Sequence, residues 1–295
     1  MGSTRKIAIL GVENSHARAF MKFVRDSGDF GDIEVCGAYS SEPGAAEKLN
    51  SEFGVPVMEN YADLAGKVDG LIVTARHGDE HLKFALPYMT DGLPLFMDKP
   101  ITVSEEDALR FADVCREKGI RFTGGSCCVH CPEVKELRET AAGGGLGRTV
   151  CGSVRAPLNT KAKYGGFFFY AQHLTEIMME IFGRYPQSVR AWMNGQNVFA
   201  AFDYGDFPVF ASFIEGSYVY RAEISAEKGV TASDICVGET AFRAEFDAFA
   251  DILRGGGRKI SVPDFIAPVF AMNAVVRSLE RGGERVPVGR PEGLE

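Results

Sequence analysis

The stretch KIAILGVENSHARAF, residues 6–20, joins an apolar, strand-like run to a helical pattern through a turn at Gly11. Dinucleotide-binding folds have their phosphate turn at such a junction, where three glycines allow a tight turn, a close approach of the phosphates and close helix packing. Of the six positions GVENSH, 11–16, only the first is glycine. The stretch therefore predicts the fold and leaves open whether a nucleotide binds.

The first 125 residues alternate between short apolar runs and segments with apolar residues at helical spacing. Such alternation is typical of βαβ units with right-handed crossovers, which form a parallel sheet covered on both faces. We predict a doubly wound, Rossmann-like α/β domain that binds its ligand beyond the C-terminal ends of the strands. The predicted strands are residues 6–10, 33–39, 69–74, 93–97 and 120–124.

The pattern changes after GGGLG at 143–147. Residues 186–226 are rich in Phe, Tyr and Val, contain turn sequences and lack a helical period, which predicts antiparallel strands joined by hairpins. We predict a strand at 149–156 and helices at 132–142, 171–183, 239–254 and 264–281. The chain thus divides into a dinucleotide-binding domain, 1–125, and an α+β domain, 126–295, with an open, mostly antiparallel sheet; the final helices are candidates for packing back on the first domain.

Charge and composition narrow the class of partner. The formal net charge is −8 and the pI is near 5.3, whereas non-specific nucleic-acid binding needs a basic face that displaces phosphate counterions. No apolar run reaches the roughly 18 residues that span a bilayer, and the first ten residues lack the apolar core of a secretory signal. We expect a cytoplasmic protein with a small-molecule partner, and neither a nucleic acid nor a membrane as partner.

Seven cysteines in a chain without a secretory signal favour free thiols over a disulfide framework. The CCVHC cluster holds four residues of metal-ligating type: Cys127, Cys128, His130 and Cys131. Zinc sites usually draw pairs of ligands from two separated segments, and no second Cys/His pair with that spacing occurs in this sequence. We therefore predict no metal site and keep zinc binding by this cluster as a minor alternative.

The phosphate turn has its own chemistry. A carboxylate at Glu13 repels phosphates if it faces them, whereas Asn14 and Ser15 are good N-cap residues and the side chains of Ser15 and His16 are able to donate hydrogen bonds to an anion. At the end of the second strand, Ser40 stands where NAD-binding domains have an acidic residue for the ribose. A serine there tolerates a 2′-phosphate, so NAD and NADP both stay open; the alternative is that Ser40 only caps the next helix.

The fourth predicted strand ends in Asp98-Lys99-Pro100. A lysine directly after a buried parallel strand projects into the crevice at the sheet's C-terminal edge, where its ammonium group polarises a bound hydroxyl. The alternative is an ordinary surface lysine before a turn.

The order of these segments resembles the glucose–fructose oxidoreductase and inositol dehydrogenase (Gfo/Idh/MocA) family. Thr74 and His81 are followed by a helix, an apolar strand and D-K-P, as in that family. Downstream, GIRFTGG at 119–125 is similar to its sixth strand and GGFFFYAQHLTEIMMEIFG at 165–183 to its helix with an inward histidine. The resemblance covers nearly the whole chain.

The resemblance implies an NAD(P)-dependent oxidoreductase that transfers a hydride between nicotinamide and a hydroxyl carbon of a sugar, cyclitol or polyol-like substrate. It also implies a homo-oligomer, a dimer or tetramer, built through the C-terminal sheet. Lys99 and His173 would share the proton of the reacting hydroxyl, and Tyr170 is a further candidate for a catalytic hydroxyl. The implied cofactor-binding residues are Gly11, Glu13, Asn14, Ser15, His16, Ser40, Thr74, His81, Asp98 and Lys99.

The chain also departs from the family. Four positions before the helix histidine the family usually has an acidic residue, and here that position is Phe169. Together with Glu13 and Ser40, this keeps an alternative open: a non-redox descendant that binds a sugar-like ligand or acts as an inert partner subunit.

Overall fold

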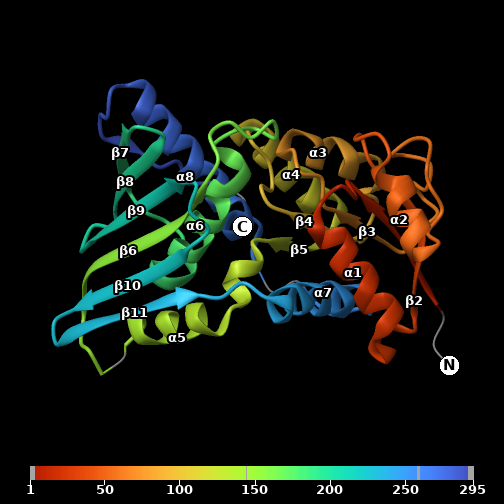
Figure 1. Cartoon of the computed structure of the whole chain (residues 1–295), viewed down its shortest axis with the longest axis horizontal. Coiled ribbons are helices and arrows are strands. Elements are labelled where there is room, and N and C mark those ends of the chain that lie inside the picture. The colour runs from red at the N-terminus through yellow and green to blue at the C-terminus, as the bar shows by residue number, and fades with distance from the viewer. Residues whose placement is uncertain (1–3, 144, 258–259, 292–295) are drawn as a thin grey trace.

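Two β-sheets lie side by side, with helices between and around them, in the computed structural model (Figure 1). The structure describes residues 4–143, 145–257 and 260–291; the predicted GGGLG turn is covered except for residue 144. The first sheet is parallel and the second mostly antiparallel, which confirms the predicted fold class.

The first half of the chain alternates strand and helix as the sequence predicts. Its elements are β1 (Arg5–Leu10), α1 (Ser15–Asp26), β2 (Ile33–Tyr39), α2 (Ala45–Phe53), β3 (Gly70–Val73), α3 (Gly78–Ala85), β4 (Pro94–Asp98), α4 (Glu105–Lys118) and β5 (Arg121–Gly125). The strand order is β2-β1-β3-β4-β5. β2 lies on one side of β1, and β3, β4 and β5 follow on the other side, so the strand order reverses direction between β1 and β3. In such sheets the ligand crevice lies beyond the C-terminal ends of the two strands at this point.

The segment at 119–125 is the fifth strand and not the sixth, so this detail of the resemblance is wrong. The place of another strand beside β2 is taken by a single bridge between Ala38 and Val57. Val57 directly follows Pro56, which has no backbone N–H to donate to a sheet. The segment therefore pairs at one residue and forms no strand.

The second half contains a seven-stranded sheet of order β11-β10-β6-β9-β8-β7-β12, in which only β6 and β9 run parallel. Its elements are α5 (Pro132–Ala141), β6 (Thr149–Leu158), α6 (Phe168–Phe182), β7 (Ser188–Asn194), β8 (Asn197–Asp203), β9 (Pro208–Glu215), β10 (Tyr220–Ala226), β11 (Gly229–Ile235), α7 (Glu239–Leu253), α8 (Val262–Glu280) and β12 (Val286–Pro287). The sequence did not predict β11, whose mixed side chains lack a clear alternation of apolar and polar residues.

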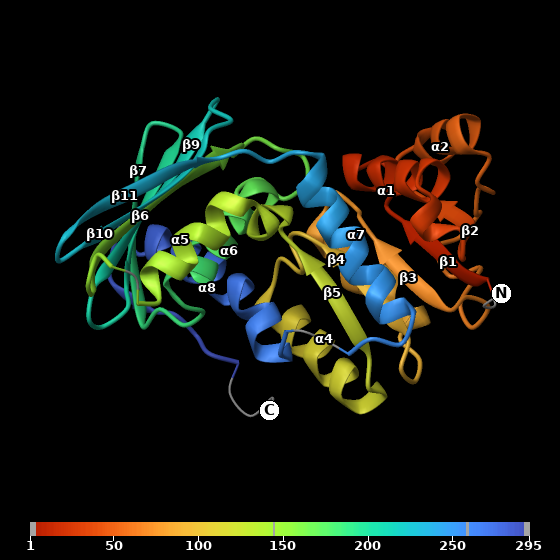
Figure 2. The same ribbon diagram turned by 90° about the horizontal axis from the view of Figure 1, so that it is seen from below.

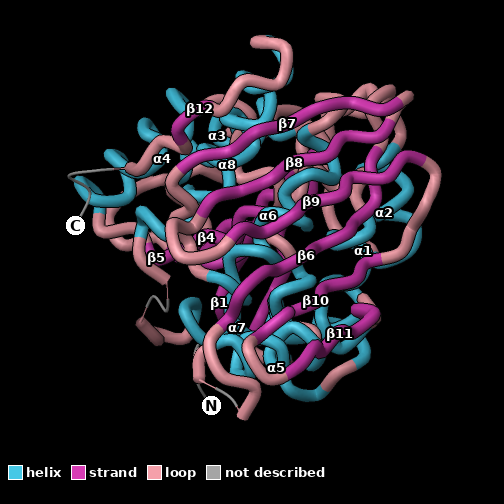
Figure 3. Tube along the Cα trace, turned by 90° about the vertical axis from the view of Figure 1, so that its left-hand side faces the viewer, coloured by secondary structure: helices cyan, strands magenta, loops and turns pink. Residues whose placement is uncertain are grey.

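Helices α5, α6 and α8 cover one face of this sheet. The other face is uncovered and is turned toward the viewer in Figure 3. Helix α8 is long and apolar enough, by composition alone, to cross a membrane, but 67% of the relevant window is buried inside the protein. It packs against α4, α6 and β7, as a core helix does.

Helix α7 returns to the first domain and lies along its sheet (Figure 2). Phe246 and Phe249 are fully buried there, and the ring of Phe246 packs 5.1 Å from that of Phe20 in α1. Burying a phenylalanine contributes roughly 1.5–3 kcal/mol. The final third of the chain therefore helps to stabilise the nucleotide-binding domain.

Gly11 offers a test of how tightly the crevice is built. Its φ is +80°, and a Cβ there would lie 2.1 Å from the backbone nitrogen of Ala75. Gly44 has nearly the same φ, +79°, with nothing within 4 Å of a Cβ. Gly44→Ala should lower the free energy of unfolding by about 1 kcal/mol, because of the left-handed backbone alone. Gly11→Ala should lower it by about 2 kcal/mol more, because the added Cβ overlaps the backbone of Ala75. Urea unfolding of both variants measures this, and equal losses would contradict it.

Candidate active site

The loop after β3 is fixed against the turn after β1 by polar groups that the sequence assigned to a cofactor. The Thr74 hydroxyl donates to the carbonyl oxygen of Gly11 at 3.0 Å, and Nε2 of His81 lies 2.6 Å from the carbonyl oxygen of Ala75. Burial lowers the pKa of His81, so its ring is neutral and donates this bond from Nε2. Thr74 and His81 thus shape the crevice from within the protein.

Glu13 spans the mouth of the crevice. Its carboxylate accepts hydrogen bonds from the Ser40 hydroxyl at 2.6 Å, at the end of β2, and from the backbone N–H of Arg76 at 2.8 Å, after β3. Ser40 also accepts from the N–H of Glu42 at 3.1 Å, but it does not cap the next helix, α2, whose N-cap is Gly44 without a side-chain hydrogen bond. The carboxylate is therefore turned toward the end of β2, the position at which a ribose-binding acid is found in NAD-binding domains.

Asp98 links the turn after β1 to the end of β4. Its fully buried carboxylate accepts a hydrogen bond from the Asn14 side-chain amide at 2.8 Å and another from the backbone N–H of Lys99 at 2.7 Å. The side-chain oxygen of Asn14 in turn caps α1 by accepting from the N–H of His16. Asn14 and Asp98 therefore position the crevice, while Ser15 stays exposed at the N-terminus of α1.

His16 does not reach the crevice. Its ring is buried, with Nδ1 3.4 Å from Asp98 and Nε2 3.2 Å from Glu245 on α7. Burial lowers the pKa of His16, but the charges of Asp98 and Glu245 outweigh this and raise the pKa overall. Burial also raises the pKa of Glu245 to about 7. The expected hydrogen bond from the His16 ring to a phosphate is not available in this geometry, because α7 packs over the ring.

Lys99 lies at the end of β4 and is only 5% exposed. Its Nζ lies 4.8 Å from the centre of the Phe169 ring, in the first turn of α6. A cation over an aromatic face is attracted by roughly 0.5–2 kcal/mol. The residue that replaces the family's acid thus holds the lysine ammonium by its ring.

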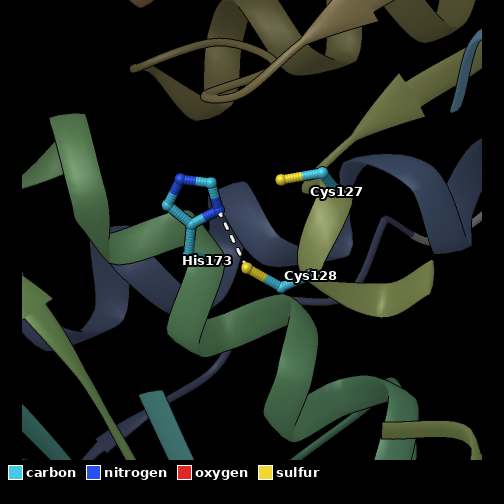
Figure 4. A group of neighbouring side chains, drawn as sticks. All are labelled: Cys127, Cys128 and His173. Atoms are coloured by element: carbon cyan, nitrogen blue, oxygen red, sulfur yellow. Dashed lines mark hydrogen bonds between the residues drawn. The ribbon is translucent and has the colours of Figure 1, made fainter. Parts of the chain in front are cut away.

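His173 lies one helical turn after Phe169 on α6 (Figure 4). Its Nδ1 is 2.7 Å from the Ser126 hydroxyl and 3.6 Å from Sγ of Cys128. Phe169 and His173 are four residues apart, so their side chains lie on the same face of α6. Because Lys99 packs on the ring of Phe169, its ammonium group lies over that face as well. The structure thereby brings the two predicted catalytic residues to one helix face.

Aromatic rings continue this face. Tyr170 stacks edge-on to Phe169 at 4.7 Å between ring centres and lies 6.2 Å from the ring of His173. On the neighbouring strand, the ring of Tyr220 meets His173 edge-on at 5.8 Å. Burial raises the pKa of Tyr170, so its hydroxyl is protonated near neutral pH.

Beneath this face, Gln172 and Glu176 connect α6 to both loops that carry site residues. Gln172 accepts a hydrogen bond from the N–H of Ile101 at 2.9 Å and donates to Glu176. Glu176 also accepts from the N–H of Ser126 at 3.1 Å. Burial raises the pKa of Glu176 to about 7.

The CCVHC cluster is divided by its fold. Cys127 and Cys128 point toward His173 (Figure 4), whereas Sγ of Cys131 donates to the carbonyl oxygen of Cys236. His130 lies in a separate hollow beside Lys135 and Glu180. The four residues of the minor zinc alternative are therefore not gathered around one point.

A cavity of about 400 Å³ opens beside Glu13, between the end of β2 and the start of α3. Four carboxylates line it: Glu13, Glu42, Asp79 and Glu80. The loop before α6 closes its outer side, where the Tyr164 hydroxyl accepts from Arg76 at 2.8 Å and Lys163 pairs with Glu42 at 3.3 Å. Carboxylates and hydroxyls suit the diol of a ribose, so the donor set at this end fits the adenosine part of a dinucleotide.

Several site residues had no signal in the sequence. Ser126, Gln172, Glu176 and Glu245 are polar residues in otherwise apolar or helical stretches, and their roles arise from contacts with distant segments. Only the run Ser126–Cys128 directly after β5, at the sheet's C-terminal edge, offered a positional clue.

Comparison with known proteins agrees with this geometry. Residues 5–126 match the sequence model of an oxidoreductase family with an NAD-binding Rossmann fold, Gfo/Idh/MocA. The rhizopine catabolism protein MocA of Rhizobium meliloti is 28% identical over 292 residues, which cover 88% of this chain and 91% of MocA. The first domain thus matches the Gfo/Idh/MocA family model, and most of the chain is similar to MocA. The matched model describes oxidoreductases with an NAD-binding Rossmann fold, which supports an NAD(P)-dependent dehydrogenase.

Solved structures share the fold of this chain. The myo-inositol 2-dehydrogenase of Lactobacillus plantarum superposes with a TM-score of 0.84 at 15% identity, covering 97% of this chain and 100% of that chain. The scyllo-inositol dehydrogenase of Lactobacillus casei, with bound NAD(H) and scyllo-inositol, superposes with a TM-score of 0.81 at 18% identity, covering 97% and 99%. At these identities the likeness concerns the fold.

Glu176 makes stability depend on pH. Its pKa is about 7 in the folded protein and 4.5 for an unperturbed side chain, so the folded state binds more protons between these values and loses stability as pH rises through this window. The loss amounts to about 3 kcal/mol. Glu176→Gln should remove this pH dependence. In urea unfolding, the free energy of unfolding of the variant should therefore rise relative to that of the wild type between pH 5 and pH 8. Exposed Glu136→Gln is the control, and parallel profiles for all three proteins would contradict the assignment.

Proposed function

We propose that the protein is an NAD-dependent dehydrogenase that oxidises a hydroxyl carbon of a sugar, cyclitol or similar polyol, or reduces the corresponding ketone. The observation that carries this proposal is the packing of Lys99 on the helix face of His173 at the C-terminal edge of the first sheet. A buried ammonium group and an imidazole at one crevice are suited to hold a hydroxyl and take its proton. The polyol class is supported by the family and by the fold of inositol dehydrogenases.

In the oxidation direction, the ammonium group of Lys99 binds the reacting hydroxyl and lowers the cost of its negative charge as the proton leaves. His173 accepts that proton while the carbon gives up its hydride. NAD, when bound, supplies the acceptor for the hydride at its nicotinamide ring. Phe169 excludes water from the ammonium group, which strengthens its charge interactions with the substrate.

The Ser126 hydroxyl orients the histidine. For Nε2 of His173 to accept a proton, Nδ1 must carry the ring hydrogen and donate it to Ser126, 2.7 Å away. Ser126 is itself held by the N–H of Cys128 at 3.2 Å. We therefore assign Ser126 as a positioning residue, in place of the missing acid at position 169.

The acidic cavity beside Glu13 favours NAD over NADP, because four carboxylates repel a 2′-phosphate and its one lining lysine is already paired with Glu42. Glu13, delivered from the phosphate turn and held by Ser40, supplies the ribose-binding carboxylate that β2 lacks.

We further propose that a second copy of the chain covers the open face of the C-terminal sheet. Trp192 and Phe210 are exposed large apolar side chains there, and Trp192 stacks on Phe199 of the adjacent strand. Clustered exposed aromatic residues are typical of interfaces. The oligomer and the cytoplasmic location both stay predictions.

Removal of either proton-handling group should lower turnover. Lys99→Met and His173→Ala are each expected to reduce kcat by about 10²-fold or more with an inositol or other polyol that the wild type oxidises. Lys48→Met, an exposed lysine on α2, is the matched control and should be unaffected. Steady-state rates of NADH formation, with circular dichroism to check folding, make the comparison.

Turnover that survives both substitutions would refute the assigned roles. Tight polyol binding by the wild type with no binding of NADH or NADPH would instead support the non-redox alternative.

The cofactor preference is tested by fluorescence titration with NADH and NADPH. The wild type should bind NADH at least about tenfold more tightly, equivalent to about 1.4 kcal/mol. Glu13→Gln should reduce this preference, because it weakens the binding of NADH and removes a carboxylate that repels the 2′-phosphate of NADPH. Glu47→Gln, on the surface of α2, should leave both affinities unchanged. Equal affinities of the wild type for both cofactors would overturn the assignment.

A further inference from the structure

Beneath the active site, three polar atoms are buried without a hydrogen-bond partner among the described residues. They are Nε2 of His16 and both carboxylate oxygens of Glu245. His16 is 3% exposed and Glu245 1%. Burying such groups without a partner costs roughly 1–3 kcal/mol for each lost hydrogen bond, and more for charged groups. Native proteins rarely leave a cluster of this kind uncompensated.

The thiol of Cys127 completes a group of three. A nitrogen of His16, Sγ of Cys127 and a carboxylate oxygen of Glu245 all lie within 4.8 Å of one another. Nε2 of His16 and Oε2 of Glu245 are 3.2 Å apart, within the distance of an ion pair. The three residues come from α1, from the 3₁₀ turn after β5 and from α7.

We propose that His16, Cys127 and Glu245 bind a divalent transition-metal ion, with zinc as the best match. Imidazole nitrogen, thiolate sulfur and carboxylate oxygen are the ligand types of protein zinc sites, with bonds of about 2.0–2.3 Å. Ligands at these bond lengths lie roughly 3–4 Å from one another around a tetrahedral ion, which is compatible with the observed spacing. The ion would bind Nε2 of His16 and a carboxylate oxygen of Glu245, and would join α7 to the first domain.

The surroundings of His16 support this assignment. Its other ring nitrogen, Nδ1, lies 3.4 Å from the buried carboxylate of Asp98. Metal-binding histidines usually donate this second N–H to a carboxylate or carbonyl, which fixes the ring for the metal. Asp98 is itself held by Asn14 and by the N–H of Lys99. The ligand is therefore oriented before the ion arrives.

A second possible group shares Cys127 but is less suitable. Cys127, Cys128 and His173 also lie within 4.8 Å of one another (Figure 4). There, however, Nδ1 of His173 is already engaged by Ser126 at 2.7 Å. Metal binding at His173 would break that bond and occupy the proposed base, whereas Nε2 of His16 and the carboxylate of Glu245 contact each other and are not engaged by another residue's hydrogen bond.

Without an ion, a proton shared between His16 and Glu245 is the competing explanation, and it needs no part of Cys127. The two explanations differ in metal content and in thiolate ligation. Neither depends on hydride transfer, so the test is separate from that of the proposed function.

The experiment uses the full chain, purified without a histidine tag and kept reduced. Elemental analysis after gel filtration in added zinc should find about one zinc ion per chain. Replacement of zinc by cobalt should produce the thiolate-to-cobalt charge-transfer band that reports a cysteine ligand. Zinc should also raise the melting temperature, since a ligand that binds only the folded state stabilises it.

Cys127→Ser and Glu245→Gln should each lose most of the zinc and the rise in melting temperature. Cys131→Ser, a neighbouring buried cysteine, and Glu133→Gln, which also has a buried carboxylate oxygen without a hydrogen-bond partner, are the matched controls and should keep both. Wild-type protein that retains no zinc and shows no cobalt band would overturn the proposal, even if a variant fails to fold. Retention of zinc by both site variants would overturn it as well.

Discussion

The buried carboxylate of Asp98 is the contact on which the arrangement of the crevice depends. It binds the cap residue of α1, accepts the N–H of Lys99 and faces the ring of His16. Asp98 therefore links the turn after β1, the lysine and the ring of His16 to one another. A buried charge is tolerated only when its hydrogen-bond partners are in place, so the crevice forms only when β1 and β4 are both correctly positioned.

Two substitutions relative to the family pattern acquire a physical explanation in the fold. Phe169 occupies the position of the family's acidic residue before His173, and its ring packs on the ammonium group of Lys99. Ser126, from another loop, contacts the histidine. At the end of β2, Ser40 stands in the place of the family's acid and donates a hydrogen bond to the carboxylate of Glu13. In both cases the polar contact comes from a residue in a different segment of the chain. The family's acidic residue is therefore absent from its usual sequence position, although a polar group lies close to that position in the folded protein.

The interior between the sheets is unusually polar for a core. Gln172, Glu176, His16 and Glu245 are all at least nine-tenths buried, and they join helices α1, α6 and α7 to the loops after β4 and β5. Such groups rigidify a structure when their partners are complete. This makes the junction of the two domains the region where protons, and by our inference a metal ion, are coupled to folding.

Much of the fold was predictable from local pattern, because the apolar spacing of strands and helices is written along the chain. Five parallel strands, the helices that follow them and the position of Lys99 at a strand end were all predicted within a few residues. Strand β11 was missed because its alternation of apolar and polar residues is weak. The direction of each side chain was not predictable: Glu13 contacts Ser40 at the end of β2, whereas His16, three residues later, contacts Glu245 on α7.

The sequence by itself determined the two sheets, the crevice between β1 and β3 and the presence of a lysine and a helix histidine near it. Only the tertiary structure decided what the residues of GVENSH do. Glu13 meets Ser40 because β2 lies beside β1, and His16 meets Glu245 because α7 returns from more than 200 residues away to pack on α1. The physical reason is that hydrophobic periodicity acts between near neighbours in the chain, whereas a buried polar side chain is oriented by partners that folding brings from distant segments.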